Sequence, residues 1–211
     1  GQPMSAAPEP ARRTVADAAT RGDQLGYTAA CGAPPLRQAI VDMYRRRYGV
    51  EVPLDAVHVT VGSSAGFTLS FLAAFDAGDA VALPSCSYPC YRNILSTLGV
   101  TPVPRQLDED FKVTAATLRT AVEARAASGE PPLRGLILSS PANPTGVMLT
   151  PGEIAELCAA CRDAGVTFVS DEIYHGIEFP AHGAPRAATA LEYTESAIVI
   201  NSFSKYYSMT G

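Results

Sequence analysis

The sequence has few basic residues and no long hydrophobic run, and each absence excludes a class of protein. Its 211 residues hold 16 Lys and Arg against 21 Asp and Glu, a formal charge of -5. Nucleic-acid binding needs clustered positive charge, and we expect the only basic run, Arg45, Arg46 and Arg47, to be the solvated face of a helix. No stretch approaches the length of a membrane span and no secretory signal is visible. We therefore predict a cytoplasmic protein with neither nucleic acid nor membrane as its partner.

The sequence also lacks the patterns of metal and dinucleotide sites. Its five cysteines are odd in number, which favours a reducing compartment. Cys158 and Cys161 form one C-x-x-C pair, but no second pair follows, and their spacing suits the buried face of a helix. His58, His175 and His182 show no ligand spacing, and we expect His175 at the rim of a pocket. No Gly-x-Gly-x-x-Gly follows a strand, so we predict neither a metal nor a dinucleotide.

Apolar runs and helical spacings alternate along the chain at about thirty residues per unit. We expect strands at residues 57–61, 80–83, 101–107, 134–139, 166–169 and 197–200. We expect helices at residues 11–20, 36–48, 67–75, 91–98, 115–127 and 151–164. The last of these should begin with a capping box of Thr150 and Glu153, with Pro151 at its first position. This alternation predicts an α/β fold with a mostly parallel sheet covered by helices on both faces.

Polar side chains follow three of the expected strands. Asn143 follows the strand at 134–139, Asp171 and Tyr174 follow the strand at 166–169, and Lys205 follows the strand at 197–200. The exits of neighbouring parallel strands lie side by side, and open α/β sheets place their sites there. An amide, a carboxylate, a phenol and an amine at this edge suit a pyridine-aldehyde cofactor held on a lysine.

Each of these side chains has a chemical reason to be present. Lys205 would hold the aldehyde as a Schiff base and move protons at the α-carbon of the substrate. Asp171 would face the ring nitrogen, because a protonated pyridinium is a better electron sink than neutral pyridine. Asn143 and Tyr174 would donate hydrogen bonds to the ring oxygen.

The phosphate and the ring face of such a cofactor need further groups. Ser63 and Ser64 stand where a strand is expected to enter a helix, and free backbone N–H groups and the helix dipole favour a phosphate there. Ser202 could add a hydroxyl, and Tyr88 could lie flat on the ring. Each residue taken alone has an ordinary explanation as a turn, surface or core residue. The joint pattern, in this order and at strand exits, carries the interpretation.

These residues resemble the class I/II aminotransferases, which are fold-type I pyridoxal-phosphate enzymes of the aspartate aminotransferase superfamily. The resemblance covers essentially the whole chain, and its most specific segments are Ser140-Pro141-Ala142-Asn143-Pro144-Thr145-Gly146, Ser170-Asp171-Glu172-Ile173-Tyr174 and Ser202-Phe203-Ser204-Lys205. It implies pyridoxal 5'-phosphate as the cofactor and a three-layer α/β/α domain. It also implies that Lys205 forms the internal aldimine.

The resemblance assigns the remaining contacts position by position. Lys205, Asp171 and Tyr174 would be the catalytic residues, and Asn143 would also face the substrate carboxylate. The cofactor phosphate would be held by Ser63, Ser64 and Ser202, and the ring would stack on Tyr88. Tyr27 matches a tyrosine that reaches the phosphate of the neighbouring subunit, which implies a homodimer.

The resemblance also divides the chain. Residues 1–33 would form an N-terminal arm and dimer-contact segment, and residues 34–211 a PLP-binding large domain without its C-terminal part. The family's phosphate-binding and substrate-carboxylate arginines would fall beyond Gly211. We therefore expect the chain to belong to a longer polypeptide and to be a poor catalyst alone. Cys86 and Ser87, before Tyr88, replace a commoner Pro or Gly.

The function that we predict is transfer of an amino group between an α-amino acid and a 2-oxo acid. Two alternatives stay open. The first is a PLP-dependent lyase on the same scaffold, of the carbon–sulfur lyase or cyclopropane-forming synthase type, which product analysis would separate. The second is an aminotransferase-like sensor domain of a transcription regulator, which a basic winged-helix segment before Gly1 would support. The sequence does not identify the amino donor.

Overall fold

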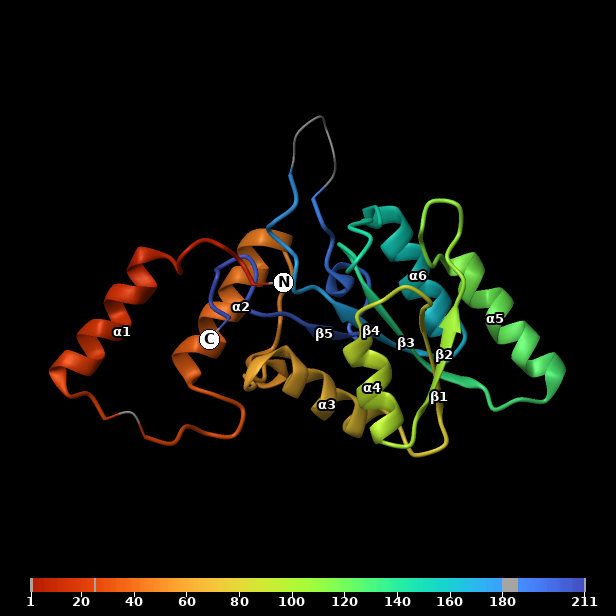
Figure 1. The fold of residues 1–211 in the computed structure, drawn as a ribbon, viewed down its shortest axis with the longest axis horizontal. Helices are drawn as coiled ribbons and strands as arrows, with labels where there is room; N and C mark the ends of the chain where they lie inside the picture. The colour runs from red at the N-terminus through yellow and green to blue at the C-terminus, as the bar shows by residue number, and fades with distance from the viewer. Residues whose placement is uncertain (1, 25, 180–185, 211) are drawn as a thin grey trace.

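The computed structural model describes residues 2–24, 26–179 and 186–210 (Figure 1). His182 and the two terminal residues lie outside these ranges. The elements in chain order are α1 (Glu9–Arg21), α2 (Pro34–Tyr48), η1 (Leu54–Ala56), α3 (Gly62–Ala74), β1 (Ala80–Pro84), α4 (Pro89–Thr97), β2 (Thr101–Arg105), α5 (Ala115–Ser128), β3 (Leu133–Ser139), α6 (Pro151–Asp163), β4 (Thr167–Asp171), η3 (Ala190–Glu192) and β5 (Ile198–Ile200). Within the described ranges, none of the helices combines the length and the apolar character needed to cross a bilayer.

The five strands form one parallel sheet in the order β2-β1-β3-β4-β5. The chain adds β2 on one side of β1 and then returns to add β3, β4 and β5 on the other side. The order of the strands therefore reverses between β1 and β3, and open α/β sheets bind ligands outside the carboxyl ends of the strands at such a point. The predicted parallel sheet is confirmed.

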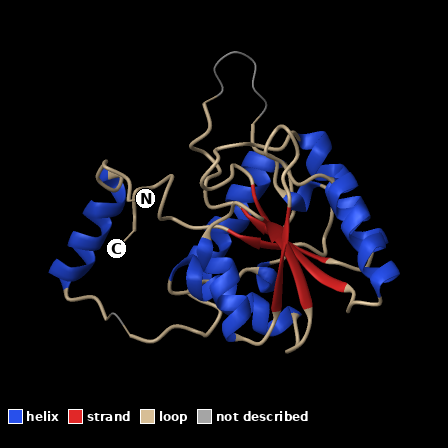
Figure 2. Ribbon diagram, turned by 45° about the vertical axis from the view of Figure 1, so that its right-hand side comes forward, coloured by secondary structure: helices blue, strands red, loops and turns tan. Residues whose placement is uncertain are grey.

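Helices cover both faces of the sheet (Figure 2). In β1, Ala80 and Ala82 face a core shared with α5 and α6, whereas Val81 and Leu83 face a second core shared with α3 and α4. Successive strand residues point to opposite faces, so a strand covered on both sides must be apolar throughout. The predicted three-layer α/β/α architecture is confirmed.

The strand that we predicted at residues 57–61 is wrong. This segment is extended, but the Val59 amide donates to the Cys31 carbonyl oxygen at 2.9 Å instead of to a strand of the sheet. Val61 is 95% exposed. Alternating apolar residues fit a pleated surface, but they form a strand only where a neighbouring strand supplies the ladder of hydrogen bonds. No described strand lies beside this segment.

The first helix stands apart from the sheet (Figures 1 and 2). None of the residues of α1, all of which the structure describes, is buried. The segment touches the other end of the chain through a hydrogen bond of 2.7 Å between the hydroxyls of Ser5 and Ser208. The division into residues 1–33 and 34–211 stays a prediction.

Candidate active site

Asp171 is the last residue of β4, and its carboxylate is deeply buried, with 1% of the residue exposed. Oδ1 accepts a hydrogen bond from the Ile173 amide at 3.2 Å, and Oδ2 accepts one from the Tyr91 hydroxyl. Burial raises the pKa of Asp171 to about 6, against the lowering effect of these two hydrogen bonds and of the Lys205 charge. The carboxylate is therefore largely ionised at neutral pH.

Lys205 follows β5 by a short loop and is half-buried. Its positive charge is close enough to Asp171 to lower the pKa of that carboxyl. The parallel pairing of β4 with β5 explains this proximity, because Asp171 stands opposite Ile200 at the same end of both strands. The structure thus brings the amine and the carboxylate to one edge of the sheet.

Tyr174 and Asn143 lie together beside this pair. Burial raises the pKa of the Tyr174 phenol, the Asp171 charge raises it further, and a hydrogen bond with the Asn143 side chain lowers it. Tyr88 is also close enough to influence the same phenol. Three side chains from the exits of β1, β3 and β4 therefore surround one spot at the carboxyl edge of the sheet.

The first turn of α3 carries Ser63 and Ser64. The Gly62 amide donates to the Thr60 carbonyl oxygen at 2.8 Å, and the described structure places no capping side chain on the amides of Ser63 and Ser64 that follow it. Uncapped N–H groups at a helix start can bind an anion. Ser64 Oγ lies 3.9 Å from Sγ of Cys90, at the start of α4. A Cβ placed on Gly66 would lie 3.5 Å from Cδ1 of Ile200, so the turn also lies against the end of β5.

Ser202 follows the end of β5, which packs against α3. Its hydroxyl accepts a hydrogen bond from the Ser204 amide at 3.0 Å and donates one to the Ser204 hydroxyl at 2.8 Å. The loop that leads to Lys205 therefore begins with a turn held by hydrogen bonds between Ser202 and Ser204.

Tyr91 is a site residue that the sequence did not reveal. It lies in α4 with 1% of its surface exposed, and its ring packs edge-on against Tyr88 with 5.6 Å between centroids. Tyr88 is the N-cap residue of α4 and Tyr91 lies in the first turn, three residues later. That spacing is the signal that could have linked Tyr91 to the site.

Tyr27 is fully exposed in the segment between α1 and α2. The single chain does not bring it to Asp171 or Lys205. Its predicted contact with the site of a neighbouring subunit stays a prediction.

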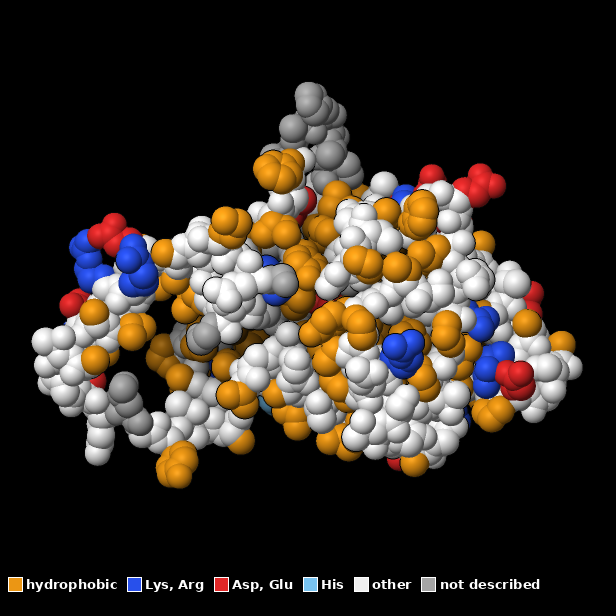
Figure 3. Space-filling view, in the orientation of Figure 1, with side chains coloured by type: hydrophobic (Ala, Val, Ile, Leu, Met, Phe, Trp, Pro, Cys, Tyr) orange, Lys and Arg blue, Asp and Glu red, His pale blue; other side chains and the backbone are white. Residues whose placement is uncertain are grey.

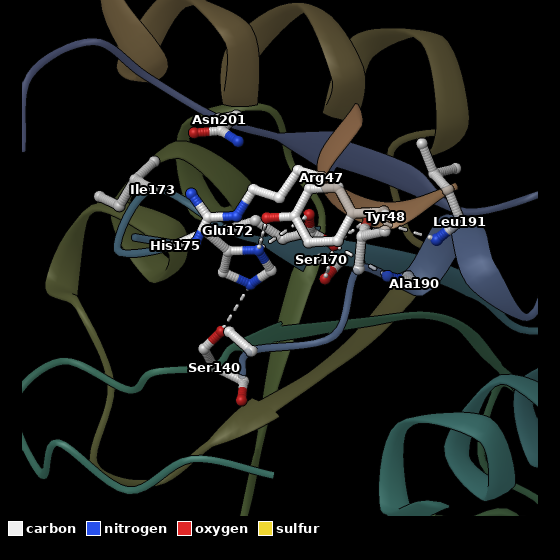
Figure 4. Close-up of polar contacts among 12 residues, drawn as sticks. Arg47, Tyr48, Ser140, Ser170, Glu172, Ile173, His175, Ala190, Leu191 and Asn201 are labelled. Atoms are coloured by element: carbon white, nitrogen blue, oxygen red, sulfur yellow. Dashed lines mark hydrogen bonds and ion pairs between the residues drawn. The ribbon is translucent and has the colours of Figure 1, made fainter. Parts of the chain in front are cut away.

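His175 does not lie at a pocket rim, so that expectation is wrong. Only 4% of the residue is exposed. Nε2 lies 2.9 Å from the Ser140 carbonyl oxygen and Nδ1 lies 2.8 Å from the Tyr48 hydroxyl (Figure 4). The imidazole is directed at Tyr48 on α2 and at the exit of β3, because a buried imidazole needs polar partners.

Arg47 also differs from the expectation of a solvated helix face. It forms an ion pair of 3.0 Å with Glu178 and lies over the rings of Tyr48 and Tyr206. Tyr206 adjoins Lys205, so Arg47 links α2 to the loop that carries the lysine.

Cys158 and Cys161 lie in the core on α6, as their spacing predicted. Burial raises the pKa of Cys158 to about 11 and that of Cys161 to about 12. Both thiols are therefore protonated and unreactive at neutral pH.

Comparison with known proteins identifies the family. A profile described as aminotransferase class I and II matches residues 1–211. This chain belongs to the class I and II aminotransferase family. Members of this family typically depend on pyridoxal phosphate.

Two curated relatives of this chain are named as aminotransferases. The valine–pyruvate aminotransferase of Mycobacterium tuberculosis is 49% identical over 100% of the chain, which covers 52% of that protein. The aspartate aminotransferase of Geobacillus stearothermophilus is 31% identical over 93% of the chain, which covers 50% of that protein. The chain thus spans about half the length of these curated relatives.

Solved structures agree with this assignment. An aminotransferase from Mycobacterium tuberculosis matches with a TM-score of 0.90 and 48% identity, covering 100% of this chain and 52% of that chain. A mutant of Thermus thermophilus aspartate aminotransferase matches with a TM-score of 0.90 and 26% identity, covering 100% and 56%. The described sheet and its helices therefore correspond to about half of each of these solved aminotransferase chains.

Proposed function

We propose that the chain forms the cofactor-binding part of an aminotransferase that uses pyridoxal 5'-phosphate. The single observation that carries this proposal is the buried Asp171 carboxylate within electrostatic reach of Lys205, at the carboxyl edge of a parallel sheet. The whole enzyme would move an amino group from an α-amino acid to a 2-oxo acid. The family membership and the named relatives favour transfer over the lyase and sensor alternatives.

The residues present fit this cofactor. Asp171 supplies a buried anion for a protonated ring nitrogen, and Tyr174 and Asn143 supply donors for a ring oxygen. The uncapped start of α3 supplies backbone donors for a phosphate, with Ser64 beside them. A pyridine ring, a phenolate and a phosphate on one small molecule match this set of groups.

When bound, pyridoxal phosphate supplies an aldehyde that condenses with amines and a ring that withdraws electrons from the attached carbon. Lys205 would supply the amine that holds this group, and it would also be the base that takes the α-proton of the substrate and returns it elsewhere. The negative charge of Asp171 would favour a proton on the ring nitrogen. Tyr91 and the Ile173 amide keep that carboxylate ionised in a buried place.

The remaining residues would bind and orient. Asn143 and Tyr174 would hold the ring oxygen, and Asn143 would also meet the substrate carboxylate. Tyr88, which is 38% exposed, would cover one face of the ring. Ser63, Ser64 and Ser202 would hold the phosphate. Together with the residues named above, they complete the proposed set of cofactor-binding residues.

We propose a branched aliphatic amino acid as the donor and pyruvate as the acceptor. The support is the 49% identity to an enzyme named for valine and pyruvate. Valine and pyruvate would give alanine and 3-methyl-2-oxobutanoate, which balances atoms without an external oxidant.

We also propose a homodimer in which Tyr27 reaches the neighbouring site. Large hydrophobic side chains of the α3 region are exposed, with Val61 at 95%, Leu69 at 57% and Leu72 at 59%. Figure 3 shows hydrophobic side chains gathered over the middle of the face that it draws. Exposed apolar patches of this kind mark protein–protein interfaces.

Borohydride reduction of the full-length protein loaded with cofactor tests the proposal. The chain contains two lysines, Lys205 and Lys112, and Lys112 is paired with Glu153 at 2.7 Å. We expect the reduced label on Lys205, loss of both label and turnover in Lys205→Ala, and retention of both in Lys112→Ala. Undiminished turnover in Lys205→Ala would refute the mechanism, and release of ammonia without an amino acceptor would favour the lyase.

A further inference from the structure

Glu172 directly follows Asp171 and is equally buried, with 1% of the residue exposed. Its two oxygens have different surroundings (Figure 4). Oε1 accepts three hydrogen bonds, from the Ser170 hydroxyl at 3.0 Å, the Thr189 hydroxyl at 3.0 Å and the Ala190 amide at 2.9 Å. Oε2 is buried without a hydrogen-bond partner among the described residues. A buried polar atom without a partner is uncommon and needs an explanation.

His175 is close to Oε2 but has no proton to offer it. Nδ1 of His175 lies 3.6 Å from Oε2 of Glu172. Nε2 carries the ring proton, because it faces the Ser140 carbonyl oxygen, which only accepts. Nδ1 then accepts the hydrogen bond of the Tyr48 hydroxyl. Burial lowers the pKa of His175 to about 4, so the ring stays neutral with a single N–H.

We propose that Glu172 is a neutral carboxylic acid with its proton on Oε2, and that it positions Asp171 and Tyr174 through the hydrogen bonds to Oε1. An ionised Oε2 would be a bare negative oxygen beside the lone pair of a neutral imidazole, which is strongly unfavourable in a protein core. A proton on Oε1 would compete with three donors that already point at it. The hydrogen-bond pattern thus leaves Oε2 as the place for the proton.

The electrostatics agree with this assignment. Burial raises the pKa of Glu172 to about 7, and the Asp171 charge raises it too, whereas the hydrogen bonds to Oε1 lower it. Two adjacent buried carboxylates disfavour each other's ionisation. Neutrality of Glu172 therefore leaves Asp171 as the charged member of the pair.

The other titratable groups around Glu172 stay neutral over the same pH range. Burial raises the pKa of the phenols of Tyr44 and Tyr48 on α2 and of the Cys158 thiol on α6. The charged groups around His175 and Tyr48 are joined in two ion pairs, Arg47 with Glu178 and Arg186 with Glu192. A change in the charge of this region between pH 5 and 8 is therefore assigned to Glu172 and Asp171.

The positioning role follows from the turn after β4. Asp171 and Tyr174 face the site, whereas Glu172 and His175 are bonded behind it. Oε1 of Glu172 ties the turn to the segment at 189–190, and the imidazole ties it to α2 and to the exit of β3. This part of the inference rests on the proposed function, whereas the protonation state of Glu172 does not.

Two substitutions of Glu172 separate hydrogen bonding from charge. Glu172→Gln keeps an acceptor at Oε1 and mimics the neutral acid, whereas Glu172→Leu leaves three buried donors without an acceptor. Glu156→Gln, at an exposed position of α6, is the matched control. The measurements are the Tm of the full-length, cofactor-free protein against pH and the infrared carboxylic-acid band of the buried side chain.

At a pH one unit below 7, we expect the Tm of Glu172→Gln to lie within about 3 °C of the Tm of the parent protein. Under the same conditions, the Tm of Glu172→Leu should be lower by on the order of 10 °C. A folded-state pKa raised above the unfolded value means that the parent protein loses stability as the pH rises from about 4.5 to about 7. Glu172→Gln should therefore gain Tm relative to the parent over that window. A carboxylic-acid infrared band should be lost in Glu172→Gln and kept in Glu156→Gln.

Either of two results overturns the proposal. One is a Glu172→Gln protein destabilised at every pH, which would show that a charged carboxylate is needed. The other is an infrared spectrum that Glu172→Gln leaves unchanged. Pyridoxal phosphate affinity is then measured separately: a larger loss in Glu172→Leu than in Glu172→Gln supports the positioning role, and equal losses refute it. Absence of cofactor binding by the parent protein would refute the proposed function but leave the Tm and infrared results interpretable.

Discussion

The hydroxyl of Tyr91 donates a hydrogen bond to Oδ2 of Asp171, across 80 residues of sequence. The bond joins α4, in one helical layer, to the end of β4 in the sheet. It lowers the pKa of a carboxyl that burial alone would push higher. A residue that packs as part of the apolar core thus also controls the charge of the proposed site.

Tyr91→Phe should raise the pKa of Asp171 above about 6 and weaken cofactor binding. A hydrogen bond to a charged group contributes about 1.5–3 kcal/mol, which corresponds to roughly 10–100-fold. The acid limb of the pH profile of kcat/KM should move to higher pH. Tyr193→Phe, on the α6 side of the sheet, is the control, and an equal effect of both variants would contradict the assignment.

Asp171→Asn should abolish activity while stabilising the cofactor-free protein above pH 6. The folded-state pKa of Asp171 is raised from 3.8 to about 6, so stability is lost as the pH rises through that window. Removing the charge should recover up to roughly 2–3 kcal/mol of unfolding free energy, because one pKa unit is about 1.4 kcal/mol. Denaturant unfolding at two pH values measures this, and a variant less stable than the parent at pH 8 would contradict it.

Gly176→Ala should displace the loop of Lys205. Gly176 has a φ of +100°, and a Cβ there would lie 2.7 Å from Cδ2 of Tyr206 and 2.9 Å from Nη1 of Arg47. Gly129→Ala is a matched control, since Gly129 also has a positive φ but nothing within 4 Å. We expect a loss of about 1 kcal/mol for Gly129→Ala and about 2–4 kcal/mol for Gly176→Ala, measured by chemical denaturation.

Ser64→Ala should weaken pyridoxal phosphate by about tenfold and leave phosphate-free pyridoxal unaffected. The reason is the loss of one hydrogen bond to a charged phosphate at the start of α3. Ser70→Ala, on the same helix, is the control. Titration of both ligands by absorbance gives the comparison, and an equal loss for the two ligands would place Ser64 away from the phosphate.

The parallel sheet was predictable because its signals are local. The runs at 80–83 and 136–138 are apolar throughout, as the centres of strands covered on both faces must be. The capping box of α6 was also correct: the Thr150 hydroxyl accepts from the Glu153 amide at 3.2 Å, and Glu153 accepts from the Thr150 amide at 2.7 Å. Both ends of such an interaction lie within a few residues of each other.

The errors and omissions concern partners that are distant in sequence. The run at 57–61 has the alternation of a strand but no described strand beside it. In the sequence, Tyr91 looks like an ordinary core residue of a helix. Only its hydrogen bond to Asp171, seen in the structure, links it to the candidate site. His175 was expected at a rim because it follows Tyr174, but its partners are 35 and 127 residues away. Local sequence patterns do not reveal contacts between residues that are so far apart in the chain.

The shortness of β5 bears on the stability of the cofactor-free protein. β5 has three residues and, in the described sheet, a ladder with β4 only, in which Ile200 stands opposite Asp171. A strand of three residues contributes few ladder hydrogen bonds, so we expect its amides to exchange early in native-state hydrogen exchange. A molecule bound by both Asp171 and Lys205 would link the end of β4 to the loop after β5. Its binding free energy would then stabilise the pairing of these two strands. The cofactor would then have a structural role as well, because its binding would hold β5 against β4.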